Sequence, residues 1–239
     1  MREEQVGGLR TRITGGVDGK GGGRGPLVLL LHGFGAPGDD LVQLAEVLNV
    51  PVGTRLVFPE GPLSLMFGPA DARAWWLIDM ARMAADQAAG RVRDLSNEIP
   101  KGLAPAREIM LAFLKEVEQT FGADPRKTIL GGFSQGAMLS CDLMLRTAQP
   151  YAGLIQLSGT LLAVQDWMPL LKKRKTVPVF QSHGTRDDIL PYAGAEKLRD
   201  TLTHAGLSVE WHSFRGGHEI PGPVLRSLGP FIAKAVTHT

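Results

Sequence analysis

From residue 27 to the end, the chain alternates short apolar runs with segments of helical spacing, and this alternation restricts the fold more than any other feature. The run Leu27–Leu31 is apolar at every position, which is typical of a strand buried on both faces of a sheet. Segment 106–121 instead has apolar residues three and four positions apart, as an amphipathic helix requires. The pattern predicts an α/β fold, with a mostly parallel central sheet and helices on both of its faces.

The remaining elements are predicted from the same two periodicities. A strand near residues 9–14 is expected at an edge of the sheet, and a short helix is expected within residues 80–92. Asp39 or Asp40 is the expected N-cap of a helix over residues 41–48. Further strands are expected at 55–58, 128–131, 153–157, 177–182 and 208–213, and further helices after 134 to about 147, at 164–172, at 193–205 and up to about 236.

The length and composition fit a single domain. A chain of 239 residues with 44% hydrophobic residues can bury a sizeable core, and neither an internal repeat nor a linker is visible, so we expect one domain over residues 1–239. Residues 61–105 are harder to interpret, because apolar and aromatic side chains are dense there and Pro and Gly interrupt both ends. We expect this segment to form a lid or part of an acyl pocket.

The charge balance gives little reason to expect a polyanionic partner. Lys plus Arg number 26 against 24 Asp plus Glu, so neither nucleic acid nor an anionic membrane is predicted to bind. No apolar run is long enough to span a membrane, and the N-terminus lacks a secretory signal, so a cytoplasmic location is predicted. The single cysteine, Cys141, excludes an intramolecular disulfide, and the scattered histidines suggest no metal site.

The glycine-rich stretch at residues 15–25 has two interpretations. It could cradle a phosphate, but it does not match the G-x-x-x-x-G-K-[ST] pattern, and no strand leads directly into it with a helix behind. A flexible hairpin loop is the favoured interpretation.

The stretch Gly132-Phe-Ser134-Gln-Gly136 follows a predicted buried strand and opens a predicted helix. It matches G-x-S-x-G, in which the serine occupies a strained turn between strand and helix. Glycines are expected two positions before and after Ser134, because a Cβ there would clash with the neighbouring strand or helix. The alternative is a glycine-rich turn with a solvated serine, and the rest of the chain decides between the two.

Polar groups follow several of the predicted strands. His32-Gly-Phe-Gly35, Ser134, Asp187 with Asp188, and His218 all come at such ends. Functional groups of open α/β sheets gather at the carboxyl ends of the strands. A serine nucleophile needs a base within hydrogen-bond reach, and the base needs an acidic residue to orient it. The chain order Ser, Asp, His is that of an α/β-hydrolase.

Several segments together resemble one family of α/β-hydrolases, the acyl-protein thioesterase, carboxylesterase and phospholipase family. They occur in the family's order between residues 32 and 221. The resemblance implies hydrolysis of carboxylic esters or thioesters without a cofactor, and some members of the family dimerise. The matching segments are His32-Gly-Phe-Gly-Ala-Pro-Gly-Asp-Asp40, Arg73-Ala-Trp75, Gly131-Gly-Phe-Ser-Gln-Gly-Ala137, His183-Gly-Thr-Arg-Asp187 with Pro191, and Gly217-His-Glu-Ile-Pro221.

The catalytic roles are assigned with this resemblance in view. Ser134 is expected to be the nucleophile and His218 the general base. The family pattern H-G-x-x-D-x-x-V-P places the acid at Asp187, although this chain has Asp188 where a proline is usual and Leu190 where valine is usual. Asp188 and, more remotely, Asp166 remain alternatives.

The oxyanion hole is expected from backbone N–H groups. One belongs to Gln135, whose side chain is not expected to matter, and the family pattern places the other at Phe34. The resemblance also implies that His32 braces the loop of Phe34. His183 is expected to pack or to bond backbone, and the other histidines to lie on the surface or in the core.

The acyl pocket is predicted only in outline. Its candidate residues are apolar and lie in the 61–105 segment or beside Asp187, and the alternative is that about half of them belong to the core. Residues 79–105 are longer than the resemblance implies, and could narrow the site or form a subunit contact. The candidates are Leu63, Met66, Phe67, Trp75, Trp76, Ile189 and Leu190.

These features predict a serine carboxylic ester hydrolase that acts on small-molecule esters of short to medium acyl length. The alternatives are a lysophospholipase or acyl-protein thioesterase, then another α/β-hydrolase such as a peptidase or lactone hydrolase, and last a non-catalytic binding protein. A homodimer is also considered, on the basis of the resemblance.

Overall fold

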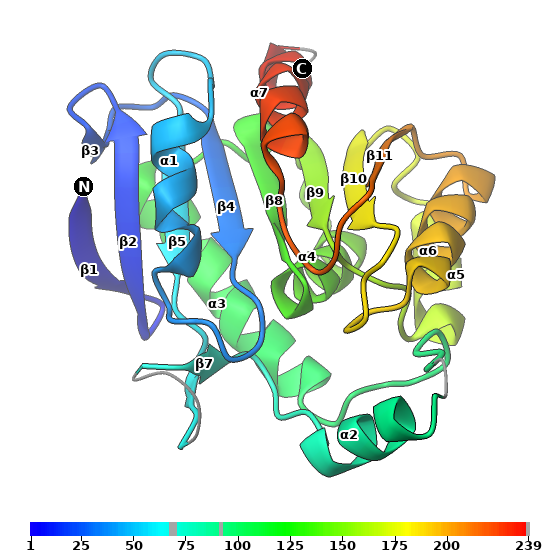
Figure 1. The fold of residues 1–239 in the computed structure, drawn as a ribbon. Helices are drawn as coiled ribbons and strands as arrows, with labels where there is room; N and C mark the ends of the chain where they lie inside the picture. Colours follow the sequence, from blue (N-terminus) through cyan, green and yellow to red (C-terminus); the bar gives the residue numbers. More distant parts are fainter. Residues whose placement is uncertain (67–70, 91–92, 238–239) are drawn as a thin grey trace.

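The computed structural model of the chain describes residues 1–66, 71–90 and 93–237 (Figure 1). Within these ranges a nine-stranded sheet has the order β1-β2-β5-β4-β8-β9-β10-β11, with β3 paired to β2. The strands are β1 Arg2–Val6, β2 Leu9–Gly16, β3 Lys20–Gly22, β4 Leu27–Leu31, β5 Arg55–Pro59, β8 Thr128–Phe133, β9 Gly153–Leu157, β10 Val179–Gly184 and β11 Val209–Phe214.

Within the nine-stranded sheet, the neighbours along β5-β4-β8-β9-β10-β11 pair in parallel, as the sequence predicts, whereas β1–β2 and β2–β5 are antiparallel. The helical segments are η1 Asp40–Gln43, α1 Leu44–Val47, α2 Met80–Ala88, α3 Leu103–Phe121, η2 Pro125–Lys127, α4 Gln135–Arg146, α5 Val164–Leu171, α6 Tyr192–His204 and α7 Gly222–Thr237.

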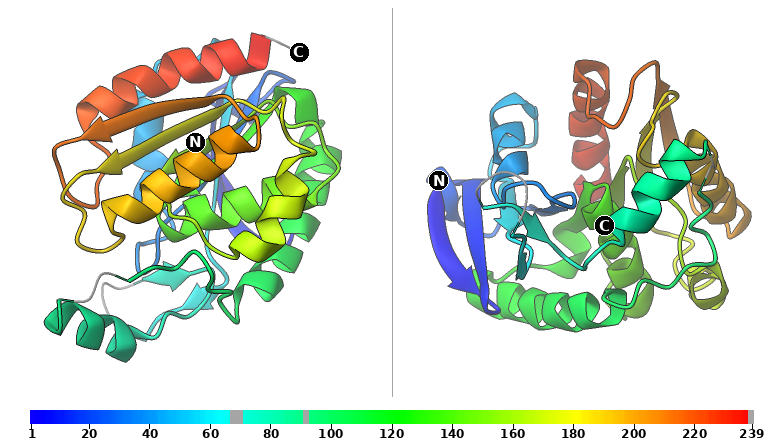
Figure 2. Two further views of the ribbon diagram at one scale, coloured as in Figure 1. Left: turned by 90° about the vertical axis from the view of Figure 1, so that its right-hand side faces the viewer. Right: turned by 60° about the horizontal axis from the view of Figure 1, so that its bottom comes forward.

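Helices cover both faces of the sheet, which explains why β4 is apolar throughout (Figures 1 and 2). Leu27, Leu29 and Leu31 point into the core that contains α3, α4, α5 and α6. Val28 and Leu30 point into the other core, under α1 and α7. Because successive side chains of a strand face opposite sides, a strand buried on both sides must be apolar at every position.

Some predicted elements differ in the structure. The strand expected at the edge is β2, and β1 lies outside it, joined by a tight turn in which Gly7 and Gly8 both have positive φ. The helix expected at residues 41–48 is a 3₁₀ turn followed by one short α-helix, and Asp39 makes no capping bond. Helix α3 starts at Leu103 because Pro105 is tolerated in a first turn, where no backbone N–H is needed.

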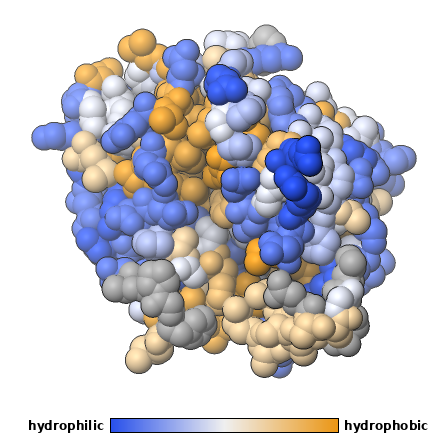
Figure 3. Space-filling view, in the orientation of Figure 1, coloured by the Kyte–Doolittle hydropathy of each residue, from blue (hydrophilic) through white to orange (hydrophobic). Residues whose placement is uncertain are grey.

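The described residues of the segment expected as a lid include a small hairpin and a helix. A small hairpin of β6 Leu63–Ser64 and β7 Arg73–Ala74 is followed by α2, and α2 lies beyond the carboxyl ends of the parallel strands (Figures 1 and 2). Figure 3 shows pale orange, apolar colouring in the region of α2 along the lower edge of the molecule. Met80, the first residue of α2, and Leu77 just before the helix are exposed. The chain then returns to the body, where Ser96 O and Glu98 O accept hydrogen bonds from the start of α5.

The glycine-rich stretch is held together by one aspartate. Asp18 Oδ1 accepts the N–H groups of Lys20 and Gly22 and so folds residues 15–22 into a compact loop. It is not the expected hairpin, because β3 pairs with the end of β2 in parallel. Among the described residues, no helix is long and apolar enough to cross a membrane. A search of the same residues finds no group of three or more His, Cys, Asp or Glu side chains placed to hold a metal ion.

Candidate active site

Ser134 stands between β8 and α4 with φ 54° and ψ −116°, a backbone conformation that is rare outside glycine. Its N–H donates to Leu157 O at 2.9 Å, which fastens the turn to β9. Such strain persists only where the surrounding structure enforces it, and it is common at functional sites. The elbow expected from the G-x-S-x-G motif is therefore present.

The two glycines of the motif are required by close backbone contacts. A Cβ on Gly132 would lie 2.5 Å from Leu31 O and 2.6 Å from the carbonyl carbon of Gly136. A Cβ on Gly136 would overlap the same carbonyl of Leu31, at the end of β4. The structure thus confirms the steric reason that the sequence predicts for both positions: β4, β8 and α4 meet there.

Asp187 and His218 are joined by a hydrogen bond of 2.6 Å between Oδ2 and Nδ1. The other carboxylate oxygen accepts the N–H groups of Ile189 and Leu190 at 2.9 and 2.8 Å, and His183 Nε2 lies 3.2 Å from Oδ2. Burial alone would raise the pKa of Asp187, but the hydrogen bonds from His183 and His218 outweigh it and hold the pKa well below its usual range. The carboxylate is therefore ionised at neutral pH.

The loop after β11 places His218 beside the elbow. The His218 ring packs against Phe133, with 4.7 Å between the ring centroids, and Phe133 directly precedes Ser134. The next residue of the loop, Glu219, accepts a 3.4 Å hydrogen bond from Ser158 at the end of β9. The structure thus brings the predicted acid and base together at the elbow.

The other carboxylates considered as the acid lie in different surroundings. Asp188 is exposed, next to Asp187. Asp166 lies on α5 and pairs with Arg146 at 3.0 Å. His183 bonds the backbone carbonyl of Leu190 through Nε2 at 2.8 Å, the kind of contact that the sequence analysis expects of it.

The loop after β4 lies against the elbow. A Cβ on Gly33 would be 3.4 Å from Ser134 Cβ, and Gly35 has a positive φ of 77° that suits glycine. Phe34 stands between these glycines, and Gln135 is the first residue of α4, whose N–H has no acceptor within the helix. Both backbone groups expected to form an oxyanion hole therefore lie on segments that flank Ser134.

His32 is buried and bonds on both sides of its ring. Gly61 N–H donates to Nε2 at 2.8 Å, so Nδ1 carries the hydrogen and donates to Gly33 O at 2.7 Å. Burial lowers the pKa of His32, which favours the neutral ring that this arrangement requires.

The side chain of Gln135 has a role that the sequence analysis does not foresee. It is fully buried; its Oε1 accepts Trp75 N–H and its Nε2 donates to Trp76 O, both at 2.9 Å. Trp75 in turn donates its indole N–H to His32 O at 2.9 Å. The expectation that only the backbone of Gln135 matters is wrong, because its amide fastens the segment after β7 to the elbow.

Replacement of Gln135 by Met should destabilise the fold, because Trp75 N–H and Trp76 O would be buried without partners. We expect a loss of about 2 to 4 kcal/mol in the free energy of unfolding, measured by urea titration. The control is Gln43→Met, which removes one exposed hydrogen bond to Asp40 O and should change stability by less than about 0.5 kcal/mol. Equal stability of the Gln135 variant and the wild type would contradict the role of the amide.

The candidate acyl-pocket residues divide into two groups. Trp75, Trp76 and Leu190 are buried in the main core, which agrees with the alternative that about half of the candidates are core. Leu63, Met66 and Ile189 are exposed, Met66 to 98% of its surface. Phe67 lies outside the described residues.

A hollow of about 550 Å³ lies elsewhere, where β9 and β10 begin. Its lining includes Ala152, Val179 and Phe231 together with Arg126 and Lys173, and none of the predicted catalytic residues. It is at the opposite end of the strands from the elbow.

Comparison with known proteins identifies the family of the chain. The family described as phospholipase/carboxylesterase matches residues 17–236. Acyl-protein thioesterase 1 of Kluyveromyces lactis is 29% identical over 222 residues, 88% of this chain and 92% of that protein. Acyl-protein thioesterase 1 of Emericella nidulans is 24% identical over 220 residues, 87% of this chain and 90% of that protein.

Solved structures show the same fold. Esterase PE8 superimposes with a TM-score of 0.76 at 28% identity, covering 95% of this chain and 99% of that chain. A Bacillus cereus carboxylesterase superimposes with a TM-score of 0.68 at 20% identity, covering 95% and 94% of the two chains. The resemblance noted in the sequence is confirmed: the chain belongs to the phospholipase/carboxylesterase family, a family of carboxylic ester hydrolases with the α/β-hydrolase fold.

Proposed function

We propose that the chain is a serine carboxylic ester hydrolase that forms an acyl-enzyme intermediate on Ser134. The observation that carries the proposal is the 2.6 Å hydrogen bond between Asp187 and His218, next to the strained serine turn. Asp187 accepts from Nδ1, which leaves Nε2 of His218 as the nitrogen that takes the serine proton.

The reaction follows from these positions. His218 Nε2 removes the proton from Ser134 Oγ while Oγ attacks the ester carbonyl, and the C=O electrons move to the oxygen. The N–H groups of Gln135 and Phe34 stabilise this oxyanion. When the tetrahedral intermediate collapses, the C–O bond to the alcohol breaks and His218 protonates the leaving group. Water, activated by the same imidazole, then hydrolyses the acyl-enzyme.

The substrate is proposed to be a small-molecule ester of short to medium acyl length. Support comes from the exposed apolar side chains of Leu63, Met66 and Ile189 and from the apolar surface of α2. An acyl chain laid over such a surface would bury apolar area that now faces water.

A second function is acyl-protein thioesterase or lysophospholipase activity. It is favoured by the comparison, since curated relatives at 24–29% identity are named acyl-protein thioesterase 1. Hydrolysis of a thioester would use the same groups, with a thiol in place of the alcohol as leaving group. A peptidase or a non-catalytic binder has no comparable support.

The proposal is tested with a fluorophosphonate probe and an ester series. We expect the probe to label one tryptic peptide, at Ser134, in the folded protein and not after heat unfolding. p-Nitrophenyl esters from acetate to palmitate should show the highest kcat/KM at short or medium length. A folded protein that reacts with neither probe nor esters would contradict the proposal.

A paired substrate separates the two functions. An oxygen ester and a thioester with the same acyl chain are compared, and lysophosphatidylcholine is assayed beside them. A higher kcat/KM for the oxygen ester supports the carboxylesterase proposal, and a preference for the thioester supports the second function. A cytoplasmic location and a homodimer stay predictions, testable by cell fractionation and by light scattering.

A further inference from the structure

The loop that carries Phe34 is held by two segments distant in the sequence. Gly35 N–H donates to Arg73 O at 2.8 Å, and Arg73 N–H donates to Ala36 O at 2.9 Å. From the other side, Gly61 N–H donates to His32, whose ring donates in turn to Gly33 O. The position of Phe34 N–H therefore depends on where β7 and the turn after β5 lie.

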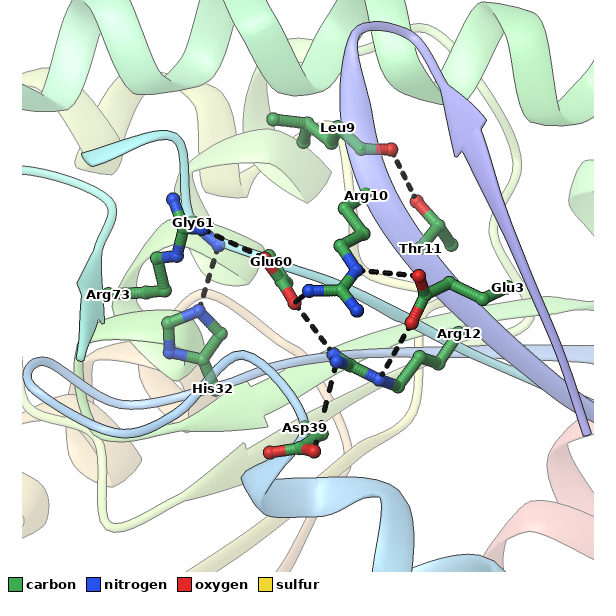
Figure 4. Close-up of polar contacts among 10 residues, drawn as sticks. All are labelled: Glu3, Leu9, Arg10, Thr11, Arg12, His32, Asp39, Glu60, Gly61 and Arg73. Carbon is green, nitrogen blue, oxygen red and sulfur yellow. Dashed lines mark hydrogen bonds and ion pairs between the residues drawn. The ribbon is translucent and has the colours of Figure 1, made fainter. Parts of the chain in front are cut away.

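One side chain, Glu60, links these two segments (Figure 4). It directly precedes Gly61, and its Oε2 lies 3.4 Å from Arg73 Nη2. Its Oε1 accepts a 2.8 Å hydrogen bond from Arg12 and lies 3.6 Å from Arg10, both on β2. Its own N–H donates to Arg10 O at 2.9 Å.

Glu60 also touches the far end of the loop. A Cβ on Gly38 would overlap Cγ of Glu60, so the stem of Glu60 packs directly against the Gly38 backbone. Gly61 also lies close to its neighbours, since a Cβ there would lie 2.7 Å from Ala74 O and 3.2 Å from His32 Nε2. The loop is thus bounded by Glu60 at one end and by His32 at the other.

The carboxylate of Glu60 is buried and is shared by three arginines rather than paired with one. The Glu60 side chain is only 7% exposed, and guanidinium groups of Arg10, Arg12 and Arg73 surround its carboxylate. A buried carboxylate shared by several cations resists displacement, because moving it away from them would leave its own buried charge without a partner. The alternative role is purely structural, as a link between β2 and β5.

We propose that Glu60 is a positioning residue for the oxyanion loop of the proposed ester hydrolysis, acting through Gly61 and His32 on one side and Arg73 on the other. This inference rests on the proposed function. Removal of the Glu60 charge would let the turn after β5 and β7 shift relative to each other. The Phe34 N–H would then be displaced from the developing oxyanion, while Ser134, Asp187 and His218 would keep their places.

The test is Glu60→Gln, which keeps the size of the side chain and removes its charge. We expect kcat for p-nitrophenyl butyrate to fall about ten- to a hundredfold, with KM changed by less than about twofold, because only the transition state carries the oxyanion. Ser134 Oγ adds to the carbonyl carbon of a trifluoromethyl ketone while its proton passes to His218, and the ketone oxygen becomes the oxyanion. The Kd of the ketone should rise by the same factor as kcat falls. A general loss of stability would not produce this parallel change.

The matched control is Glu3→Gln. Glu3 contacts the same arginines, Arg10 at 2.7 Å and Arg12 at 3.4 Å, but it is about 42% exposed and does not reach the loop. It should retain wild-type kcat and ketone affinity. Equal losses in the two variants would overturn the proposal, since the arginine cluster as a whole would then be responsible.

A second variant covers a failure of Glu60→Gln to fold. Arg73→Gln leaves Glu60 bonded to Arg12 and keeps the backbone bonds of β7, and it should show a smaller loss of kcat with the same parallel loss of ketone affinity. A folded Glu60 or Arg73 variant with unchanged kcat and ketone Kd overturns the inference alone. A wild-type protein that never forms the ketone adduct overturns the proposed function instead.

Discussion

Replacement of Ser134 by alanine is expected to lower kcat for ester hydrolysis about 10⁶-fold, the size of effect found when a serine nucleophile is removed. The variant lacks the Oγ that forms the acyl-enzyme, and His218 has no proton to accept. The rate is measured with p-nitrophenyl butyrate at enzyme concentrations high enough to detect the residual activity. Fluorophosphonate labelling should be lost in the same protein.

The control for this variant is Ser158→Ala. Ser158 also has a positive φ, 48°, and also ends a strand, but its hydroxyl bonds Glu219 O at 3.4 Å. It tests whether loss of any serine hydroxyl at a strained strand end is sufficient to stop the reaction. An active Ser134→Ala enzyme, or equal losses in both variants, would contradict the assignment of the nucleophile.

Replacement of Asp187 by asparagine is expected to lower kcat about 10³- to 10⁴-fold, because the imidazole would be held in the wrong tautomer. All the groups around the carboxylate in the structure act as donors: the N–H groups of Ile189 and Leu190 on one oxygen, and His218 and His183 on the other. An amide has one acceptor oxygen and an NH₂ group. It must therefore either leave the backbone N–H groups unpaired or turn its own donor toward His218.

The matched control is Asp188→Asn, next along the chain and exposed. It should keep nearly all of the activity, as should Asp166→Asn on α5. If the Asp188 variant instead loses activity and the Asp187 variant does not, the acid has been assigned to the wrong residue. The assay is again kcat with p-nitrophenyl butyrate, with folding checked by circular dichroism.

The stability of the Asp187 variant should depend on pH in a defined direction. The pKa of Asp187 is depressed in the folded protein, so its contribution is present above the pKa of an unfolded Asp, about 3.9, and is lost as the pH falls through the folded value. The difference in free energy of unfolding between wild type and Asp187→Asn should therefore be constant near neutrality. It should shrink steadily below about pH 4.

The sheet and the elbow could be predicted because their causes are local in the sequence. A run such as Leu27–Leu31 reports burial on both faces by itself, and Gly132 and Gly136 mark a backbone contact that excludes any Cβ. Asp187 is predicted from the resemblance to the family, whose pattern fixes the offset of the acid from His183-Gly184, and the structure puts its carboxylate on His218.

Other features could not be predicted, because they depend on contacts between distant segments. The Gln135 amide bonds the backbone of Trp75, 60 positions away, and a glutamine has no pattern that marks such a bond. Glu60 meets Arg12 across 48 positions, and both are common surface residue types. Strand β1 consists of three consecutive charged residues, a glutamine and one valine, so it carries little signal of its own and depends on pairing with β2.

The hairpin of β1 and β2 limits how far the N-terminus can be truncated. The family match begins at residue 17, so a protein trimmed to that boundary would lose β1 and β2 and with them Arg10 and Arg12. Strand β5 would become an open edge, and of its three arginine partners Glu60 would keep Arg73. The turn at Gly7, which lies directly on the backbone of Phe113, would no longer cover α3. With the positioning role proposed for Glu60, truncation at the family boundary should therefore cost both solubility and rate.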